Sequence, residues 1–264
     1  MRLQLNIGSS FPKKSLGQNF ITDKNFLLKL NNFVYATNKN IIIEIGPGKG
    51  ALTNHLIKSK FKKLYLIEKD NDLAATLEEK YKMFKNITVI NQDALLYDFN
   101  YFHKKRGVII YGNLPFNIST KLLIKWIERD SWPSFFEKMI LMFQKEVADR
   151  IIATHNTKKY GRLSVLVQSR CNVTKLLDAP ASVFNPKPKV DGSLLLFEPI
   201  KDYSNIDFAK LGRLLELSFS SRRKKIRNTL EQYREILLDL KIDENLRPEN
   251  LSVAEYCELV KSIH

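Results

Sequence analysis

The stretch from Asn40 to Ile57 constrains the fold more than any other part of the chain. Its first half, through Ile45, is mostly β-branched and apolar, as expected of a strand buried on both faces of a sheet. A glycine turn, Gly46-Pro47-Gly48-Lys49-Gly50, follows directly, and the residues from Ala51 to Ile57 are typical of a helix. Strand, glycine turn and helix in this order predict the first unit of a nucleotide-binding α/β sheet.

The spacing of the glycines indicates which class of ligand the turn can bind. Glycine lets the backbone approach a ligand closely, and Gly46 and Gly48 are the candidates for that role. The spacing G-x-G-x-G differs from the dinucleotide pattern G-x-G-x-x-G, and no phosphate-loop Gly-Lys-Ser/Thr ending is present. The loop therefore fits the amino-acid portion of a nucleoside ligand such as S-adenosylmethionine.

Two carboxylates follow the next two predicted strands. Glu68 ends the strand Leu64–Ile67, where it can accept both ribose hydroxyls of a nucleoside. Asp93 follows the strand Ile87–Ile90, and we expect it to accept from an adenine amino group. A lone carboxylate after a strand is more often a turn or cap residue. Successive strand ends that carry Gly, Glu and Asp favour one ligand site, because ligands bind beyond these ends in open parallel sheets.

A fourth strand end, residues 112–120, reads Gly-Asn-Leu-Pro-Phe-Asn-Ile-Ser-Thr. Asn113 offers a side-chain carbonyl acceptor, and Pro115 stiffens the turn so that nearby backbone carbonyls point outward. Phe116 supplies a π-face on which a base can stack. These groups suit the capture of a nucleobase amine. The alternative is an ordinary strand-to-helix loop in which Ser119 caps the helix.

The charge balance points to a polyanionic partner. The chain of 264 residues carries a formal net charge of +15, with a pI of about 9.6, which favours nucleic acid. The densest basic cluster contains Arg222, Arg223, Lys224, Lys225 and Arg227, which we expect to contact phosphates. On a helix Arg223 and Arg227 would share a face. The alternative is that these basic residues lie at a solvent-exposed helix end and contact no phosphate.

Several classes of protein are disfavoured. Cys171 and Cys257 lie far apart without a C-x-x-C pair, which indicates a reducing compartment and no disulfide framework. The four histidines share no metal-ligand spacing, so we expect no metal. No apolar run approaches membrane-spanning length, and the first residues do not resemble a signal peptide. A cytoplasmic location is therefore expected.

The order of elements predicts two domains. Strands and helices alternate from residue 40 to about 155, which indicates a parallel sheet with right-handed crossovers. After Pro199 the pattern is helical to the end of the chain. We therefore expect a ligand-binding α/β domain over 1–199 and an all-helical RNA-binding domain over 200–264.

Two further strands are expected to close the sheet, over Cys171–Leu177 and Ser193–Phe197. The linker between them is rich in proline and contains Phe184. Its aromatic ring is either a plug of the core or a second stacking face for a base, and the sequence leaves both open.

Taken together, the chain from about residue 11 to its end resembles the ribosomal RNA adenine dimethyltransferase family. The segments that carry the resemblance are Gln18–Ile21, Glu44–Gly50, Glu68, Gln92–Ala94, Asn113–Ser119, Phe184–Gly192 and Ser221–Asn228. The resemblance implies a class I (Rossmann-like) methyltransferase sheet with a small C-terminal all-helical domain. It also implies S-adenosylmethionine as the methyl donor and N6 of adenine as the acceptor.

The resemblance also implies the roles of particular residues. The cofactor pocket or its edge would be formed by Asn19, Ile21, Gly46, Glu68, Asp93 and Asn113. Asn113, Leu114, Pro115 and Phe116 would hold the target base. The Asn113 side chain and the carbonyl of Leu114 or Pro115 would accept the two hydrogens of the adenine amine. At the position of Phe116 the small-subunit branch usually has tyrosine, so a stacking ring is kept and a hydroxyl is absent.

The segments Val183–Asp191 and Arg222–Asn228 favour the small-subunit branch of the family. That branch methylates two adjacent adenosines in a hairpin loop near the 3′ end of the rRNA. The expected partner is then small-subunit rRNA in an immature ribosomal subunit, bound by a monomer through Phe184 and the basic cluster. Two other interpretations are a DNA adenine-N6 methyltransferase, whose turn usually reads Asp/Asn-Pro-Pro-Tyr, and a non-catalytic ribosome-assembly factor.

Overall fold

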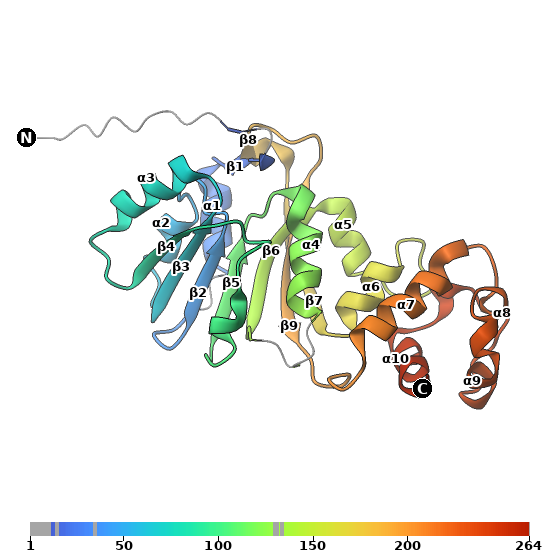
Figure 1. Cartoon of the computed structure of the whole chain (residues 1–264). Coiled ribbons are helices and arrows are strands. Elements are labelled where there is room, and N and C mark those ends of the chain that lie inside the picture. Colours follow the sequence, from blue (N-terminus) through green and yellow to red (C-terminus); the bar gives the residue numbers. More distant parts are fainter. Residues whose placement is uncertain (1–11, 14–15, 34–35, 129–131, 133–134, 264) are drawn as a thin grey trace, which may run out of the picture. The chain divides into compact units, whose positions relative to one another are not determined.

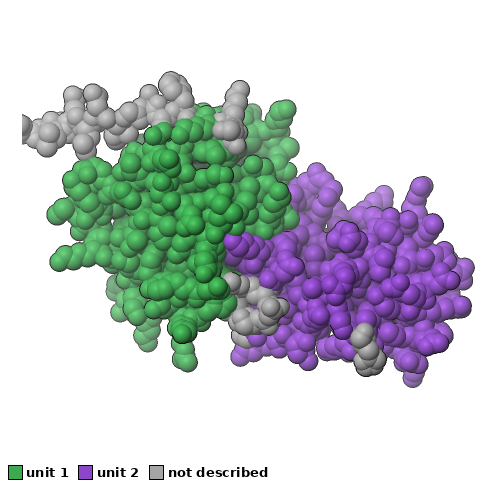
Figure 2. All heavy atoms as spheres, in the orientation of Figure 1, with its two compact units in different colours: residues 1–122, 135–144, 176–195 green, residues 123–134, 145–175, 196–264 purple. Residues whose placement is uncertain are grey.

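The computed structural model describes residues 12–13, 16–33, 36–128, 132 and 135–263. Contacts divide the chain into two compact units (Figure 2). Unit 1 comprises residues 1–122, 135–144 and 176–195, and unit 2 comprises 123–134, 145–175 and 196–264. Unit 2 therefore gathers segments that precede Pro199 with those that follow it. The expected domain boundary between residues 199 and 200 stays a prediction.

A seven-stranded sheet, in the order β4-β3-β2-β5-β6-β9-β7, organises the chain (Figure 1). Its strands in chain order are β2 (Ile41–Ile45), β3 (Lys63–Glu68), β4 (Ile87–Asn91), β5 (Val108–Gly112), β6 (Lys138–Gln144), β7 (Cys171–Ala179) and β9 (Gly192–Pro199). The five strands from β4 to β6 are parallel, as the alternation of elements predicts. Every residue of β2 and β5 is buried, which explains their continuous apolar sequence.

The helices of unit 1 precede or connect these strands along the chain. They are α1 (Lys24–Asn31), α2 (Thr53–Leu56), α3 (Asn71–Tyr81), the short 3-10 helix η2 (Phe99–Phe102) and the first part of α4 (Phe116–Ile127). The side chain of Asp23 caps α1 by accepting from the amide of Phe26 at 2.7 Å. The helix expected over residues 51–57 is shorter than predicted. Ser119 lies inside α4, where its hydroxyl donates to the Phe116 carbonyl, so it is not the helix cap.

A second, two-stranded sheet joins distant parts of unit 1. β1 (Phe20–Ile21) pairs antiparallel with β8 (Phe184–Asn185), so that Ile21 lies opposite Phe184. β8 follows the 3-10 helix η3 (Ala181–Val183) in the proline-rich linker. The sequence predicted neither strand, because each is two residues long and is stabilised by a partner far away along the chain.

Unit 2 is largely helical and has its own core. Its remaining elements are α5 (Lys145–Ile151), α6 (Arg162–Gln168), α7 (Phe208–Ser218), η4 (Phe219–Ser221), α8 (Ile226–Thr229), η5 (Glu231–Tyr233), α9 (Arg234–Asp239), η6 (Pro248–Asn250) and α10 (Val253–Ser262). Buried side chains from α6, α7 and α10 form one apolar cluster, which includes Val165, Leu211, Leu215 and Leu259. These contacts explain the fold of helices that are individually too short to be stable alone.

The basic cluster of unit 2 differs from its predicted conformation. Residues 222–224 form a turn and bend after η4, and α8 begins only at Ile226. Arg223 therefore lies outside the helix that contains Arg227. The expectation that these two side chains share a helix face is wrong, because the chain turns at residues 222–224 and the helix begins at Ile226, which is fully buried.

Candidate active site

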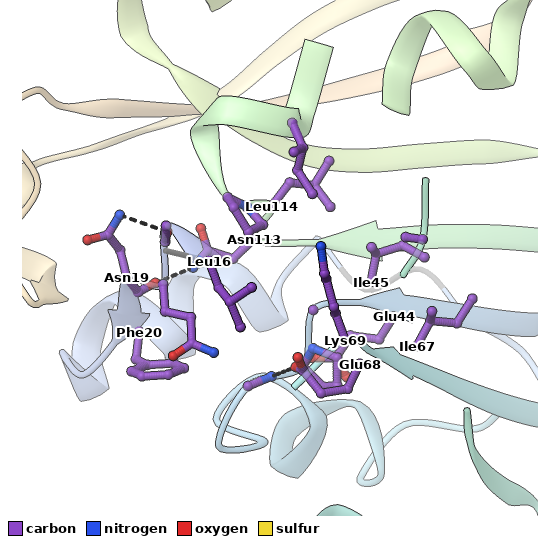
Figure 3. A pocket seen from close by; sticks show the side chains of 18 of the residues that line it. Leu16, Asn19, Phe20, Glu44, Ile45, Ile67, Glu68, Lys69, Asn113 and Leu114 are labelled. Carbon is purple, nitrogen blue, oxygen red and sulfur yellow. Dashed lines mark hydrogen bonds between the residues drawn. The ribbon is translucent and has the colours of Figure 1, made fainter. Parts of the chain in front are cut away.

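One pocket of unit 1 collects the candidate residues at the carboxyl ends of β2, β3, β4 and β5 (Figure 3). Its volume is about 220 Å³. It is lined by every residue expected to hold the cofactor, namely Asn19, Ile21, Gly46, Gly48, Glu68, Asp93 and Asn113. Leu114, Pro115, Phe116 and Phe184 line the same pocket. Side chains that are far apart in sequence thus meet where a parallel sheet binds its ligands.

The glycine turn after β2 adopts a backbone that favours glycine. Gly46, Gly48 and Gly50 have φ angles of +64°, +57° and +76°. A Cβ atom added to Gly48 would lie 2.7 Å from Cε1 of the Phe20 ring. The turn is therefore both left-handed and closely packed, so a larger residue at position 48 would displace a wall of the pocket.

Glu68 braces the loops around it. Its side chain is 5% exposed, and its Oε2 accepts from the Gly48 amide at 3.0 Å while Oε1 accepts from the Asp70 amide at 2.9 Å. Burial raises the pKa of this carboxyl group, and the backbone hydrogen bonds oppose that rise. Each oxygen retains a lone pair for a ribose hydroxyl. The contact of Glu68 with a ribose stays a prediction, and the sequence did not reveal its hydrogen bonds to the amides of Gly48 and Asp70.

Glu68→Gln should weaken S-adenosylmethionine binding about tenfold, near the ~1.4 kcal/mol of one hydrogen bond to a charged group. The amide keeps one acceptor, but its NH₂ group faces a backbone N–H that needs an acceptor. Isothermal titration calorimetry measures the affinity, with Glu78→Gln on the exposed surface of α3 as the matched control. Unchanged affinity would exclude Glu68 from the cofactor site.

Glu44, at the end of β2, is a second buried carboxyl group of the pocket lining. It is 1% exposed, and its Oε2 accepts from the Thr53 hydroxyl at 2.7 Å. Burial raises the pKa of Glu44 to about 8, against the opposing effect of the Thr53 hydrogen bond. In the sequence Glu44 stands out only as a charged side chain inside an apolar strand and as the first residue of the Glu44–Gly50 segment.

The raised pKa of Glu44 predicts a pH effect on stability. The native state keeps a proton that the unfolded chain releases above its ordinary pKa near 4.5, so stability falls as the pH rises from about 4.5 to about 8. Glu44→Gln removes this titration. The melting temperature of the variant minus that of the parent should therefore increase from pH 5 to pH 8. Each kcal/mol of difference in the free energy of unfolding corresponds to roughly 2–4 °C. A difference independent of pH would contradict the assignment.

Asp93 carries an ion pair that the sequence did not predict. Its Oδ2 lies 2.8 Å from the ammonium of Lys69, and its Oδ1 accepts from the Leu95 amide at 2.9 Å. Lys69 is 55% exposed and also lines the pocket (Figure 3). The expected partner of the adenine amino group therefore already has a cation beside it. Lys69 follows Glu68 directly, and only the three-dimensional structure places it next to Asp93.

The turn after β5 fixes the orientation of Asn113. Its Nδ2 donates to the Asn19 carbonyl at 2.9 Å, which leaves Oδ1 as the acceptor for a ligand. The Pro115 carbonyl accepts from the amides of Ile118 and Ser119, at 3.0 and 3.1 Å, in the first turn of α4. Of the two carbonyls that the sequence left open, that of Leu114 is therefore the better acceptor for a target amine. The ring of Phe116 is half-buried and does not belong to the core.

Comparison with known proteins places this site in a family. The family model for "Ribosomal RNA adenine dimethylase" matches residues 10–264. The chain belongs to the ribosomal RNA adenine dimethylase family. It is 44% identical to the ribosomal RNA small subunit methyltransferase A of Pelagibacter ubique, over 94% of this chain and 95% of that protein. Its identity to the protein of the same name from Ehrlichia ruminantium is 42%, over 96% and 97% of the two chains.

Solved structures agree with the family fold. A dimethyladenosine transferase from Plasmodium falciparum superposes with a TM-score of 0.80 at 26% identity, over 91% of this chain and 95% of that chain. The 23S rRNA methyltransferase ErmE shares the fold, with a TM-score of 0.66 at 20% identity over 92% and 98% of the two chains. The class I methyltransferase fold, the family and its cofactor, S-adenosylmethionine, are thus confirmed.

The pocket of this family member fits that cofactor chemically. Glu68 has a nearly buried carboxylate that would accept from a ribose, and the left-handed turn at Gly46 and Gly48 would leave backbone accessible to the amino-acid portion. Asp93, which is paired with Lys69 in the pocket lining, is the residue expected to accept from an adenine amino group. The described residues include no group of three or more His, Cys, Asp and Glu side chains that could bind a metal. No helix in the described part of the chain is long and apolar enough to cross a membrane.

The predicted RNA-binding residues fall into two places. Phe184 is 4% exposed and lines the pocket of unit 1, whereas the basic cluster belongs to unit 2. Within the cluster, Arg222 donates to the carbonyls of Lys158 and Tyr160 and pairs with Glu249 at 2.9 Å. This arginine therefore has a structural role in unit 2, which the sequence did not reveal.

The other cations of the cluster are more accessible. Lys225 and Arg227 both donate to Oδ1 of Asn245 at 3.1 Å and remain exposed. Arg223 and Lys224 are exposed in the turn before α8, and no hydrogen bond or ion pair to a described residue involves their side chains. These two side chains are therefore the best placed of the cluster to contact phosphates.

Proposed function

We propose that this chain transfers methyl groups to N6 of two adjacent adenosines in a hairpin loop near the 3′ end of 16S rRNA. The products would be N6,N6-dimethyladenosines, and the substrate would be an immature small ribosomal subunit in the cytoplasm, bound by a monomer. The observation that carries the proposal is the Asn113 amide, whose Nδ2 is fixed on the Asn19 carbonyl beside the cofactor pocket. The relatives at 44% and 42% identity, which are named as small-subunit methyltransferases, support the choice of rRNA.

The turn after β5 supplies what the reaction needs from the protein. Adenine N6 is a poor nucleophile because its lone pair is delocalised into the ring. Asn113 Oδ1 and the Leu114 carbonyl would accept its two hydrogens, which favours a pyramidal nitrogen with a directed lone pair. When bound, S-adenosylmethionine supplies the methyl group on a sulfonium. Positioning of this kind contributes several kcal/mol to barrier reduction, about 7–11 kcal/mol at most.

Two aromatic rings of unit 1 lie near the proposed site of the target base. The base must leave its stack, which costs a few kcal/mol and less in a loop than in a helix. Phe116 at the start of α4 and Phe184 on β8 both line the pocket. We propose that Phe116 provides a stacking face that offsets this cost, while Phe184, which is 4% exposed and belongs to the core, forms part of the pocket wall.

One assay tests the proposed function directly. The protein is incubated with methyl-labelled S-adenosylmethionine and, separately, with unmethylated small subunits, large subunits and genomic DNA. Label in small-subunit rRNA, recovered as N6,N6-dimethyladenosine after nuclease digestion, is the expected result. Label in large-subunit rRNA or DNA alone would overturn the proposal, and so would the absence of label from all three.

Arg223→Gln combined with Lys224→Gln should weaken rRNA binding and make it less sensitive to salt. Loss of two phosphate contacts lowers the slope of log K against log salt by roughly 1.4–1.8. Filter binding across a salt series measures this slope. Lys201→Gln with Arg213→Gln, two exposed cations of the same unit outside the cluster, is the matched control. Equal slopes for the two double variants would indicate that the cluster is merely a solvated surface.

A further inference from the structure

Residues Leu16–Thr22, here termed the amino-terminal strap, form one wall of the pocket. All of them line it, although they precede the sheet in sequence and belong to none of its strands. The strap includes Asn19 and Ile21, which the family resemblance assigns to the cofactor site. What holds this segment in place is therefore part of the active-site geometry.

The carboxylate of Asp70, in the loop between β3 and α3, anchors one end of the strap. Its Oδ2 accepts from Nε2 of Gln18 at 3.1 Å, and its Oδ1 accepts from the Lys13 ammonium at 2.9 Å. The Lys13 amide in turn donates to Oε1 of Gln18 at 2.8 Å. Asp70 is only 3% exposed, so these contacts satisfy a nearly buried charge.

The strap contacts the catalytic groups next to this anchor. Beside Gln18, the Asn19 carbonyl accepts from Nδ2 of Asn113 at 2.9 Å. The next residue, Phe20, packs so closely on Gly48 that an added Cβ would lie 2.7 Å from its ring. Asp70 also reaches the pocket from the other side, because its amide donates to Glu68 Oε1 at 2.9 Å.

We propose that Asp70 is a positioning residue that latches the strap through Gln18 and Lys13, and that this latch sets the orientation of the Asn113 amide. Asp70 touches neither the cofactor nor the target base in this assignment. It acts through Gln18 and the backbone of Asn19, which are connected to Asn113 by the hydrogen bonds above. The inference rests on the proposed function, because it concerns the rate of the transfer reaction.

A structural role of Asp70 must be distinguished from the latch. Asp70 also caps α3, since its Oδ1 accepts from the Asp72 amide at 3.1 Å. Replacing Asp70 alone would therefore destabilise α3 as well as release the strap. Gln18 has no part in that cap, so Gln18→Ala tests the latch without altering the helix.

The experiment compares Gln18→Ala, Asp70→Asn and the double variant Gln18→Glu/Asp70→Asn. In the double variant the carboxylate introduced at position 18 accepts from the amide introduced at position 70, which restores the hydrogen bond with its polarity reversed and keeps the net charge. Two quantities are measured on each protein: the dissociation rate of S-adenosylmethionine without RNA, and kcat and KM on unmethylated small subunits. Asp72→Asn, which removes only the exposed partner of Lys13 in an ion pair of 2.9 Å, is the matched control.

Gln18→Ala should lower kcat about tenfold and speed cofactor dissociation several-fold, the size expected for one hydrogen bond to a charged group. The KM for subunits should stay within about twofold, and the double variant should recover most of kcat. Asp72→Asn should behave like the parent, because an exposed ion pair contributes little. Unchanged kcat and dissociation in Gln18→Ala, or no recovery in the double variant, would overturn the latch. If the parent fails to label small subunits, the proposed function fails, while the RNA-free dissociation rates still decide whether the latch exists.

Discussion

Asn113→Ala is expected to slow methyl transfer by about 100-fold or more, the usual cost of deleting one preorganised hydrogen-bonding group aimed at the reacting atoms. The substitution removes the Oδ1 acceptor proposed for the adenine amine. It also removes the donor that holds the Asn19 carbonyl at 2.9 Å. Single-turnover rates at saturating cofactor and unmethylated small subunits measure the effect.

Two companion measurements separate the functions of the Asn113 amide. Asn113→Asp keeps an acceptor but loses the donor to Asn19, so its rate should lie between those of the parent and the alanine variant. The affinity for S-adenosylmethionine should change by no more than about tenfold in either variant, because one neutral hydrogen bond contributes about 0.5–1.5 kcal/mol. A near-parental transfer rate for Asn113→Ala would refute the proposed mechanism.

The ligand-binding edge of the sheet could be predicted from sequence because each of its residues is recognised by its position next to an apolar strand. Gly48, Glu68, Asp93 and Asn113 each lie at the end of a parallel strand or within three residues of it, and parallel strands place their carboxyl ends together. The strand limits differ from expectation by a few residues at most. The pocket thus contains every predicted cofactor residue, although their individual roles stay predictions.

The rest of the site depends on contacts that local patterns do not encode. The ion pair between Lys69 and Asp93 joins residues on two strand ends, and the latch joins Gln18 to Asp70. The Leu114 carbonyl is preferred over that of Pro115 because the Pro115 carbonyl already accepts hydrogen bonds from the first turn of α4. Contacts between residues so far apart in the sequence can be identified only in the three-dimensional structure.

The basic cluster shows a different limit of the sequence. The spacing of Arg223 and Arg227 predicted that they share a face if both lie on one helix, but α8 begins only at Ile226. Arg222, indistinguishable from its neighbours in sequence, is committed to the carbonyls of Lys158 and Tyr160. The sequence could identify a basic segment. Only the structure distinguishes its accessible cations from Arg222, which is hydrogen-bonded within unit 2.

Phe116→Ala is expected to lose about 1–3 kcal/mol of target-base binding, the usual contribution of one base–aromatic stack. This corresponds to roughly a 5–150-fold lower transfer rate. The loss should appear at the methyl-transfer step, because the ring stands at the start of α4 beside Asn113 and is only half-buried. The affinity for S-adenosylmethionine should be nearly unchanged.

Phe116→Tyr provides the matched control for this prediction. It keeps the ring and should transfer methyl groups at close to the parental rate if stacking is the function of the side chain. If Phe116 instead supported the core, its alanine variant would lose ~3–5 kcal/mol of stability, as emptied aromatic core sites do. Melting temperature and single-turnover rate are therefore measured on the same preparations. A clearly destabilised alanine variant with a normal transfer rate would refute the stacking role, whereas a slow, stable alanine variant beside an active tyrosine variant would establish it.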